Sequence, residues 1–438
     1  MFPILDPPPI DVDRELARMR AELAAIRAGM QDAWMDEERA RAVRDVVRDT
    51  LADSGTRASF LSQDWDAGYD PGQANGLGGG AYFRLRDGSA SMQLAGMVQN
   101  RFVASSAYGP DTPAVPHTNS RWGFETKTLF LLVSGQVIDK SITYVAVLAY
   151  TSQTNRFIVV PGRIVVPYAS IRKGLGEGWG VSMGQLNVPW DLESDYLGSS
   201  KLTSGDYSIF NYRFGAGKNP GATVDWTGSS MRVTAGVFNQ FGTVSPTWES
   251  RTNLSFCVAA RAEAKWGIEW AQISRMSGIH GDSPGLVLGL GACMSNGRGQ
   301  NPQPPGSLAT PSAQGFTADA RVMLAPAVLI AQYAYMRDPV GGPELGWYQG
   351  FNLQASSFVA HGVEPFVEAC WMDDVPVEWI AQAGVNLYEG SRRVKITLKA
   401  VVPFGDGNVN GIRSISGGLG IAGADNNASF IAQLQLLF

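Results

Sequence analysis

Alternation of apolar and polar side chains, in segments of about ten residues, recurs along most of the chain. In 394–402, Val394, Ile396 and Leu398 alternate with polar neighbours such as Lys395 and Thr397. The segments 256–266, 316–324 and 379–387 follow the same pattern. Because successive side chains of a strand point to opposite faces, each segment predicts a strand with one apolar and one mostly polar face. The pattern therefore predicts an all-β protein.

Segment length and the rhythm of the connections favour a transmembrane barrel over a soluble sandwich, which can show the same alternation. A tilted strand of about ten residues is long enough to cross a bilayer. Short turns alternate with long loops rich in Pro, Gly, Asn and Ser, as in outer-membrane barrels. The predicted long loops are 105–120, 188–218, 241–254, 295–315 and 403–427.

Sixteen strands can be placed on the sequence, and this even number puts both ends of the barrel on one side. They lie near 89–104, 121–138, 141–152, 162–173, 178–187, 219–226, 231–240, 255–265, 284–294, 316–324, 328–336, 347–358, 363–372, 378–388, 393–402 and 428–438. The count requires 266–283 to be an unusually long connection on the short-turn side. The expected fold is a 16-stranded antiparallel transmembrane β-barrel with a short N-terminal α-helical coiled-coil segment.

The first 52 residues have a helical period instead. Their apolar residues are spaced 3, 4, 3 and 4 apart, the seam of a coiled coil, at Leu16, Met19, Leu23, Ile26 and Met30. A short trimeric coiled coil is expected, and a single helix packed on the main domain is the alternative. Residues 53–80 are rich in Gly, Asp and Ser and predict a linker. The predicted domains are thus a periplasmic helical segment 1–52, a linker 53–80 and a barrel 81–438.

Composition excludes several classes of protein. With 45% hydrophobic and 17% charged residues the chain is not of the disordered class. A net charge of −5, with Lys and Arg scattered, argues against nucleic acid as a partner. The three cysteines, Cys257, Cys293 and Cys370, have no CxxC spacing and predict neither a disulfide framework nor a zinc site. The first residues do not resemble a signal peptide, so either a cytoplasmic protein or a mature form is expected.

Catalytic and cofactor motifs are weak. The three histidines, His117, His280 and His361, fall far apart in predicted loops or turns, so no histidine-based triad and no enzyme is expected. The Gly runs at 174–178 and 289–291 lack a following helix and predict strand glycines rather than phosphate cradles. No metal or other cofactor is expected.

One segment resembles the first half of a calcium loop, with Asp406, Asn408 and Asn410 at ligand spacing. Its twelfth position is Gly417 rather than a bidentate Glu. The turn chemistry of a long external loop accounts for the same residues. Calcium is therefore kept only as an alternative to no cofactor.

The last eleven residues carry the most specific pattern. Their apolar row ends at Phe438, with Gln433 and Gln435 on the opposite face. This arrangement resembles the terminal strand that the outer-membrane barrel assembly machinery recognises. Phe438 is therefore the predicted assembly signal. Aromatic residues near strand ends suit the interfacial girdles of a membrane barrel, at Trp122, Tyr144, Tyr150, Tyr333, Tyr335, Trp347 and Trp371.

Three stretches resemble a known family. They are 81–138, with AYFRLRDGSASMQLAGMVQNRF and RWGFETKTLFLLVSGQV, 178–208, with GWGVSMGQLNVPWDLESDYLGSSKLTSGDYS, and 231–240, with MRVTAGVFNQ. They resemble the phosphate-selective porins of bacterial outer membranes, particularly the members that carry a coiled coil. The resemblance implies a trimeric, water-filled, sixteen-stranded porin whose third long loop, here 188–218, folds into the lumen. The dense arginine ladder and lysine cluster on which phosphate selectivity depends in that family cannot be traced here.

The inward face predicted from the alternation carries both signs of charge. Acids near the start of the inward loop would face a basic wall and set a transverse field, which admits small polar solutes. The alternative is that these charges solvate a wide lumen and pair with one another. The predicted pore-lining residues are Arg101, Glu125, Lys127, Arg163, Asp191, Glu193, Asp195, Arg232, Arg261, Glu263, Asp319, Arg321, Lys395 and Lys399.

The expected function is passive diffusion of small hydrophilic solutes and ions across a bacterial outer membrane, with size and charge filtering at 188–218. One alternative is a phosphate- or anion-selective channel. The other is a structural protein whose coiled coil tethers the membrane to the cell wall. Expected partners are outer-membrane lipid, two further copies in a homotrimer, the barrel assembly machinery and, through the N-terminal helices, peptidoglycan. An N-terminal segment in the periplasm and a signal peptide already removed are also expected.

Overall fold

The computed structural model describes most of the region predicted as the barrel and little of what precedes it. The described residues are 20–22, 65–70, 79–107, 121–151, 164–193, 202–239, 241, 256–274, 277, 283–295, 313–337, 346–373, 379–389, 393–404 and 427–438. Residues 20–22 are helical. The five residues of the predicted coiled-coil seam, from Leu16 to Met30, all lie outside the described residues. No helix among the described residues is long and apolar enough to span a membrane.

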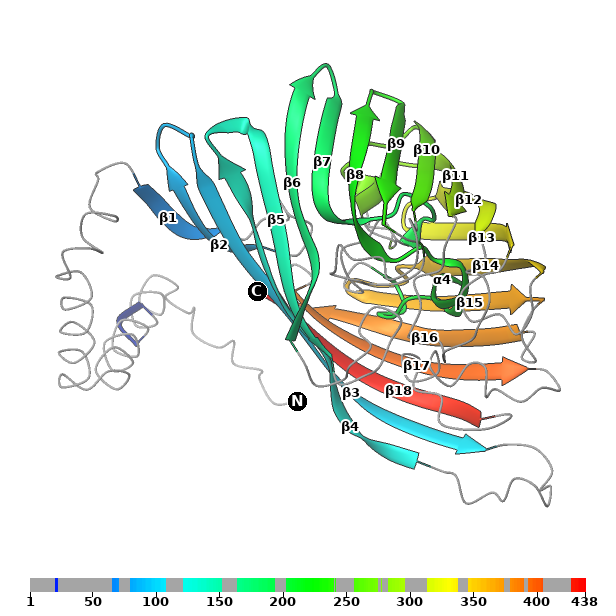
Figure 1. Cartoon of the computed structure of the whole chain (residues 1–438). Helices are drawn as coiled ribbons and strands as arrows, with labels where there is room; N and C mark the ends of the chain where they lie inside the picture. Colours follow the sequence, from blue (N-terminus) through cyan, green and yellow to red (C-terminus); the bar gives the residue numbers. More distant parts are fainter. Residues whose placement is uncertain are drawn as a thin grey trace, which may run out of the picture. The chain divides into compact units, whose positions relative to one another are not determined.

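Sixteen antiparallel strands, β3 to β18, pair each with the next, and β18 pairs with β3 to close the ring (Figure 1). This confirms the predicted barrel, and every predicted strand segment overlaps one observed strand. The strands are β3 (Ser91–Ala107), β4 (Arg121–Val137), β5 (Asp139–Thr151), β6 (Ile164–Gly176), β7 (Trp179–Asn187), β8 (Lys218–Thr227), β9 (Met231–Phe238), β10 (Cys257–Trp266), β11 (Gly285–Ser295), β12 (Gln314–Met323), β13 (Ala327–Arg337), β14 (Trp347–Ser357), β15 (Val363–Met372), β16 (Trp379–Glu389), β17 (Val394–Phe404) and β18 (Asn427–Leu437).

Two short strands precede the ring. The strand β2 (Gly80–Leu85) pairs with the first residues of β3, with Ala81 opposite Leu94. The strand β1 (Trp65–Asp70) pairs with β2, and the Arg84 guanidinium lies 2.6 Å from the Asp66 carboxylate. The segment predicted as a linker, 53–80, therefore contains a strand.

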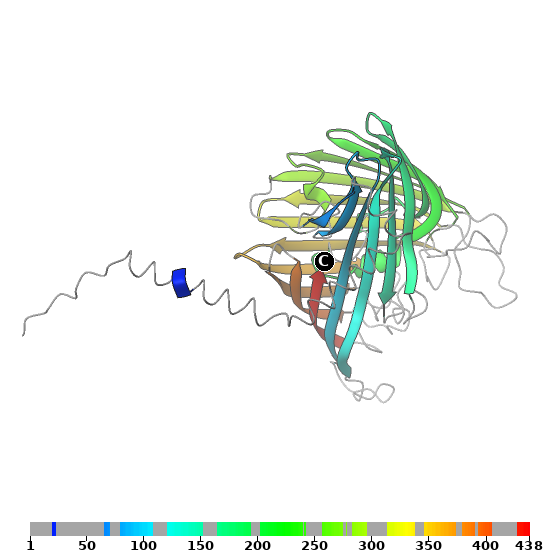
Figure 2. The same ribbon diagram turned by 90° about the vertical axis from the view of Figure 1, so that its left-hand side faces the viewer.

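The two faces of the wall differ as the alternation predicts. On β17, the inward Lys395 is 2% exposed whereas the outward Ile396 is 40% exposed. The outward row continues on neighbouring strands with other large apolar residues, among them Leu353, Val367 and Phe430. Soluble monomers rarely expose apolar patches of more than a few hundred Å². The outer wall therefore has the chemistry of a surface that contacts lipid. Figures 1 and 2 show the course of the strands that form this wall.

One part of the inner face is apolar rather than mixed. On β3 to β6 the buried residues form a cluster of Ala95, Met97, Phe130, Leu132, Val147, Ala149 and, from β18, Leu437. A register shift between Gln99 and Asn100 interrupts the pairing of β3 with β4. On β4, Lys127 and Phe130 are both buried although they are three positions apart. The β-bulge thus breaks the strict alternation within this strand.

Connections at one end of the ring are short turns, and those at the other end are long. At the short-turn end, one residue joins β4 to β5 and residues 324–326 join β12 to β13. The exception is 267–284, which joins β10 to β11 and includes the 3₁₀ helix η3 (Gln272–Ser274). This confirms that the stretch is a long connection on the short-turn side.

Replacing Leu353 by arginine is expected to destabilise the barrel in lipid more than the same change at Leu324. Leu353 lies in the middle of β14, and Leu324 lies just after the end of β12; both are exposed. Arginine on a lipid-facing wall costs about 2–4 kcal/mol at the bilayer midplane and about 0–1 kcal/mol near an interface. Urea unfolding in phospholipid vesicles measures both losses. Equal losses would contradict a lipid-facing wall.

Candidate functional site inside the barrel

The described residues of the loop between β7 and β8, 188–193 and 202–217, lie inside the ring. The Trp190 carbonyl accepts a hydrogen bond from the Thr317 hydroxyl of β12 at 2.6 Å. The Gly205 carbonyl accepts one from Lys127 Nζ of β4, also at 2.6 Å. Because β4 and β12 lie opposite each other in a ring of sixteen strands, one loop contacts both walls.

Glycines in the wall allow the loop to approach closely. A Cβ on Gly291 of β11 would lie 1.9 Å from the Trp190 carbonyl oxygen, and one on Gly350 of β14 would lie 2.5 Å from the Phe214 ring. Phe214 ends the helix α4 (Ile209–Phe214) within the loop, and its carbonyl accepts a hydrogen bond from Trp190 Nε1 at 2.8 Å. Both side chains are fully buried. Because 289–291 lies within β11, the prediction that its glycines are strand glycines is confirmed.

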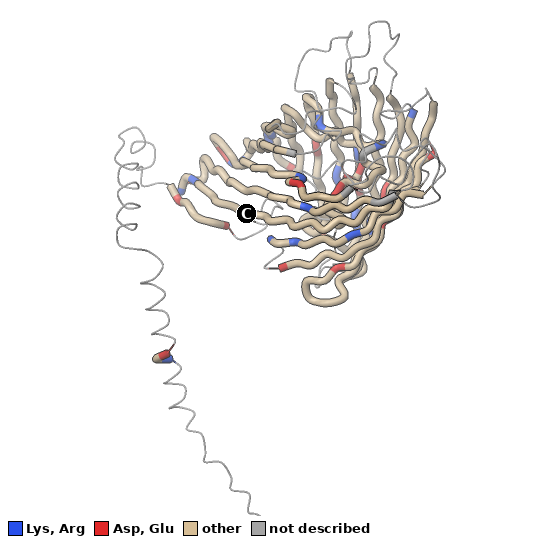
Figure 3. Tube along the Cα trace, turned by 90° about the horizontal axis from the view of Figure 1, so that it is seen from below, with Lys and Arg blue, Asp and Glu red and all other residues tan. Residues whose placement is uncertain are grey.

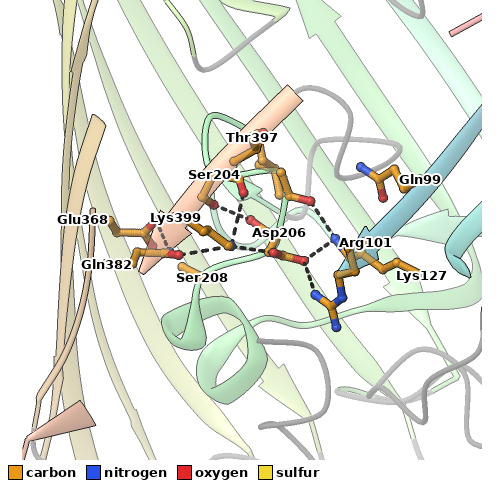
Figure 4. A network of polar contacts seen from close by, with 12 residues as sticks. Gln99, Arg101, Lys127, Ser204, Asp206, Ser208, Glu368, Gln382, Thr397 and Lys399 are labelled. Carbon is orange, nitrogen blue, oxygen red and sulfur yellow. Dashed lines mark hydrogen bonds and ion pairs between the residues drawn. The ribbon is translucent and has the colours of Figure 1, made fainter. Parts of the chain in front are cut away.

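The centre of the site is Asp206, which lies in the loop among three cations of the wall (Figure 4). Its carboxylate forms ion pairs with Lys127, with Lys399 Nζ at 2.5 Å and with the Arg101 guanidinium at 3.6 Å. All four side chains are at most 8% exposed. Burial alone would raise the pKa of the Asp206 carboxyl, but the three cations hold it well below its usual range.

Backbone carbonyls next to Asp206 bind the same wall. Lys395 Nζ donates to Leu202 O at 2.8 Å, and Lys399 Nζ donates to Ser204 O at 3.2 Å. Lys395 Nζ also donates to Thr203 O at 3.1 Å, and Lys127 Nζ donates to Gly205 O, so wall lysines bind all four carbonyls of 202–205. A carbonyl keeps its acceptor capacity at every pH, so this part of the attachment does not depend on carboxylate ionisation.

Asp191 and Glu193 are the two described acids near the start of the loop, which the sequence analysis expects to face a basic wall, and Asp191 interacts electrostatically with the buried Lys218 of β8. Asp191 accepts a hydrogen bond from Asn211 Nδ2 at 2.9 Å within the loop. Glu193 accepts hydrogen bonds from Ser208 N and Oγ at 2.8 and 2.5 Å and from Gln332 Nε2 of β13 at 2.9 Å. Burial, with the nearby Glu368 carboxyl, raises the pKa of Glu193. The acid that meets the three cations is Asp206, which sequence reasoning missed.

Other predicted pore-lining charges form pairs between strands of the inner wall. Arg101 pairs with Glu125, Arg232 pairs with Glu263, and Arg261 makes two hydrogen bonds of 2.7 and 3.0 Å to Asp319. The Arg261–Asp319 pair crosses β11 over Gly289, where a Cβ would lie 2.4 Å from the guanidinium. These pairs agree with the alternative given in the sequence analysis, in which the charges of the inner face pair with one another. Both signs are spread over many strands (Figure 3).

Some predicted residues lie outside the described part of the chain. They are Arg163, Asp195 and the calcium candidates Asp406, Asn408 and Asn410. Among the described residues no group of three His, Cys, Asp or Glu could hold a metal ion. Cys257, Cys293 and Cys370 are buried and free of disulfides.

The C-terminal residue closes a backbone contact with β3. Phe438 O accepts a hydrogen bond from Gly96 N at 2.6 Å, and Phe438 N donates to Gly96 O at 3.0 Å. The Phe438 side chain is 44% exposed. Its role as the assembly signal stays a prediction.

Comparison with known proteins supports the fold. No protein-family model matches this chain, and no curated protein matches it significantly. Among solved structures, the chain is similar to Salmonella typhi OmpF in complex with daunomycin, at 12% identity and a TM-score of 0.50, over 80% of this chain and 98% of that one. The outer-membrane protein OmpT of Vibrio cholerae is 12% identical over 80% and 100% of the two chains, with a TM-score of 0.49. At this identity the likeness to OmpF concerns the fold, which is a porin-type barrel.

Replacing Asp206 by asparagine is expected to lower the free energy of unfolding by about 3–5 kcal/mol, because buried cations lose their counter-charge. The matched control is Asp139→Asn, since Asp139 and Lys173 pair at 3.3 Å with side chains 49% and 44% exposed. Breaking that exposed pair should cost about 0–1 kcal/mol. Urea unfolding of both variants in the same detergent measures the difference. An Asp206→Asn variant as stable as the control would show that the cluster does not hold the loop.

Proposed function

We propose that this chain is an outer-membrane porin through which small hydrophilic solutes and ions diffuse passively. The observation that carries the proposal is the closed ring of sixteen strands, apolar outside and largely polar inside, with the loop 188–217 fastened across it. A closed ring satisfies every strand's backbone hydrogen bonds without water, which is the condition for crossing a bilayer with strands. The polar inner rows suit a water-filled path.

Ion selectivity is proposed to be weak. Around the loop, the cations Arg101, Lys127 and Lys399 are accompanied by the carboxyl groups of Asp206, Glu125 and Glu368. Paired charges of both signs leave little net field to favour one sign of permeant ion. They still orient polar solutes, because their dipoles are fixed and partly desolvated.

An anion-selective channel is the second candidate. It is favoured by the three cations that share the single loop carboxylate of Asp206. A phosphate-selective porin, as in the family that the sequence resembles, would be a special case of this candidate.

We also propose the cellular setting that the sequence pattern predicts. The chain lies in a bacterial outer membrane, as a homotrimer, with 1–52 in the periplasm. An even number of strands supports the placement of that segment, because the ends of β3 and β18 then lie at one end of the ring, that of the short turns. The heptad seam supports the trimer, because a short seam requires partner helices.

Reversal potentials in planar bilayers under a KCl gradient test the selectivity. The reversal potential of the native protein is expected to be near zero. That of Asp206→Asn is expected to shift toward anion preference, because the cation cluster loses one negative charge. Asp139→Asn, at an exposed turn, should leave the potential unchanged. Strong anion selectivity of the native protein would favour the second candidate. Absence of conductance from a heat-modifiable, folded barrel would refute both.

A further inference from the structure

We infer that the connection between β10 and β11, residues 267–284, is a second constriction inside the barrel, at its short-turn end, and that it forms one barrier with the loop 188–217. The inference rests on the proposed channel function. It concerns the width of the solute path at the short-turn end of the barrel, which the loop 188–217 alone does not determine.

The pairing of β10 with β11 does not require so long a connection. The two strands remain paired up to Trp266 opposite Leu286. The neighbouring β12 and β13, paired up to Met323 opposite Val328, are joined by 324–326 alone. The extra residues between β10 and β11 therefore have a different structural use.

The described part of the connection runs along the inside of the ring. Trp270 Nε1 donates to the Gly228 carbonyl in the β8–β9 turn at 2.9 Å, and the Trp270 ring lies 4.9 Å from the Arg232 guanidinium. Further along, the Ile273 carbonyl accepts a hydrogen bond from Arg321 of β12 at 2.6 Å.

The next contact is on β15, where Ser277 Oγ donates to the Glu364 carboxylate at 3.3 Å. Glu364 and Arg321 are both at most 1% exposed and face inward. These contacts lie on β9, β12 and β15, and the stretch from β9 to β15 comprises seven of the sixteen strands of the ring. The described residues 267–274 and 277 of the connection therefore contact the inner wall at points spread over more than a third of the ring.

The connection and the loop share one apolar cluster. Ile268 and Ile273 of the connection are buried, at 4% and 3% exposed, in a cluster with Leu192 and Leu202 of the loop. Apolar side chains in an otherwise polar interior gain by packing on each other, because this removes them from water. The two segments thus stabilise each other's inward position.

A polar path joins the same two segments. Glu364, which binds Ser277 of the connection, also accepts a hydrogen bond from Asn386 Nδ2 at 3.0 Å. The same amide lies 2.9 Å from the Thr203 carbonyl of the loop. Because both an apolar and a polar contact join them, a solute that crosses the barrel meets the two segments as one barrier.

Shortening the connection tests the inference. Residues 268–284 are replaced by Asn-Gly, a sequence that favours a tight hairpin turn. Single-channel conductance in planar bilayers is expected to rise several-fold over that of the native protein. Unchanged conductance of a heat-modifiable, folded variant would overturn the inference. If the native protein does not conduct, the proposed function fails instead.

A pair of point variants covers the case in which the shortened chain does not fold. Trp270→Ala removes the inward ring that contacts Gly228 and Arg232, whereas Trp266→Ala removes an outward ring that is 53% exposed. Polyethylene glycols of graded size are added on the short-turn side, and the largest one that still lowers the conductance is recorded. Trp270→Ala should raise this size limit and Trp266→Ala should not. Equal limits in the two variants would overturn the inference.

Discussion

The pairing of β18 with β3 is the interaction on which the rest of the structure depends. It sets Gln433 opposite Arg101 and removes both free edges of the sheet. Without it, two rows of backbone N–H and C=O groups would be exposed to lipid, which strands cannot tolerate. Closure also creates the interior. Only in a closed ring do β4 and β12 face each other across a space that one loop can cross.

Inside that space, the charged side chains of the wall hold the loop in place as well as line the lumen. Most acids and bases of the described inner wall bind one another or the backbone of the loop. A buried charge is tolerated only with a partner, and wall lysines find one in Asp206 and in the carbonyls of 202–205. The segments that narrow the barrel are therefore held by the residues that sequence alone would assign to the solute.

The wall could be predicted from sequence, because the side-chain period of a strand is local. The Lys395, Thr397 and Lys399 row was correctly separated from its outward neighbours in this way. The β-bulge opposite Gln99 could not be predicted from the sequence, since one extra residue in a strand does not change the composition. Asp206 and Trp270 were missed for a different reason. Their partners lie on strands distant in sequence, and only the closed ring brings those strands within reach of the loop and the connection.

The separation between Asp206 and Lys399 has a consequence for the order of assembly. The loop precedes β8 in the chain, yet Lys395 and Lys399 belong to the strand before the last. Until β17 has joined the sheet, those two lysine attachments cannot form, and the ring itself is still open. The contacts of the loop with Thr317 and Lys127 do not need β17, but the full set of its wall contacts can form only when the ring closes. The final width of the lumen is therefore set only when the last strands join the sheet, and not by the sequence of the loop alone.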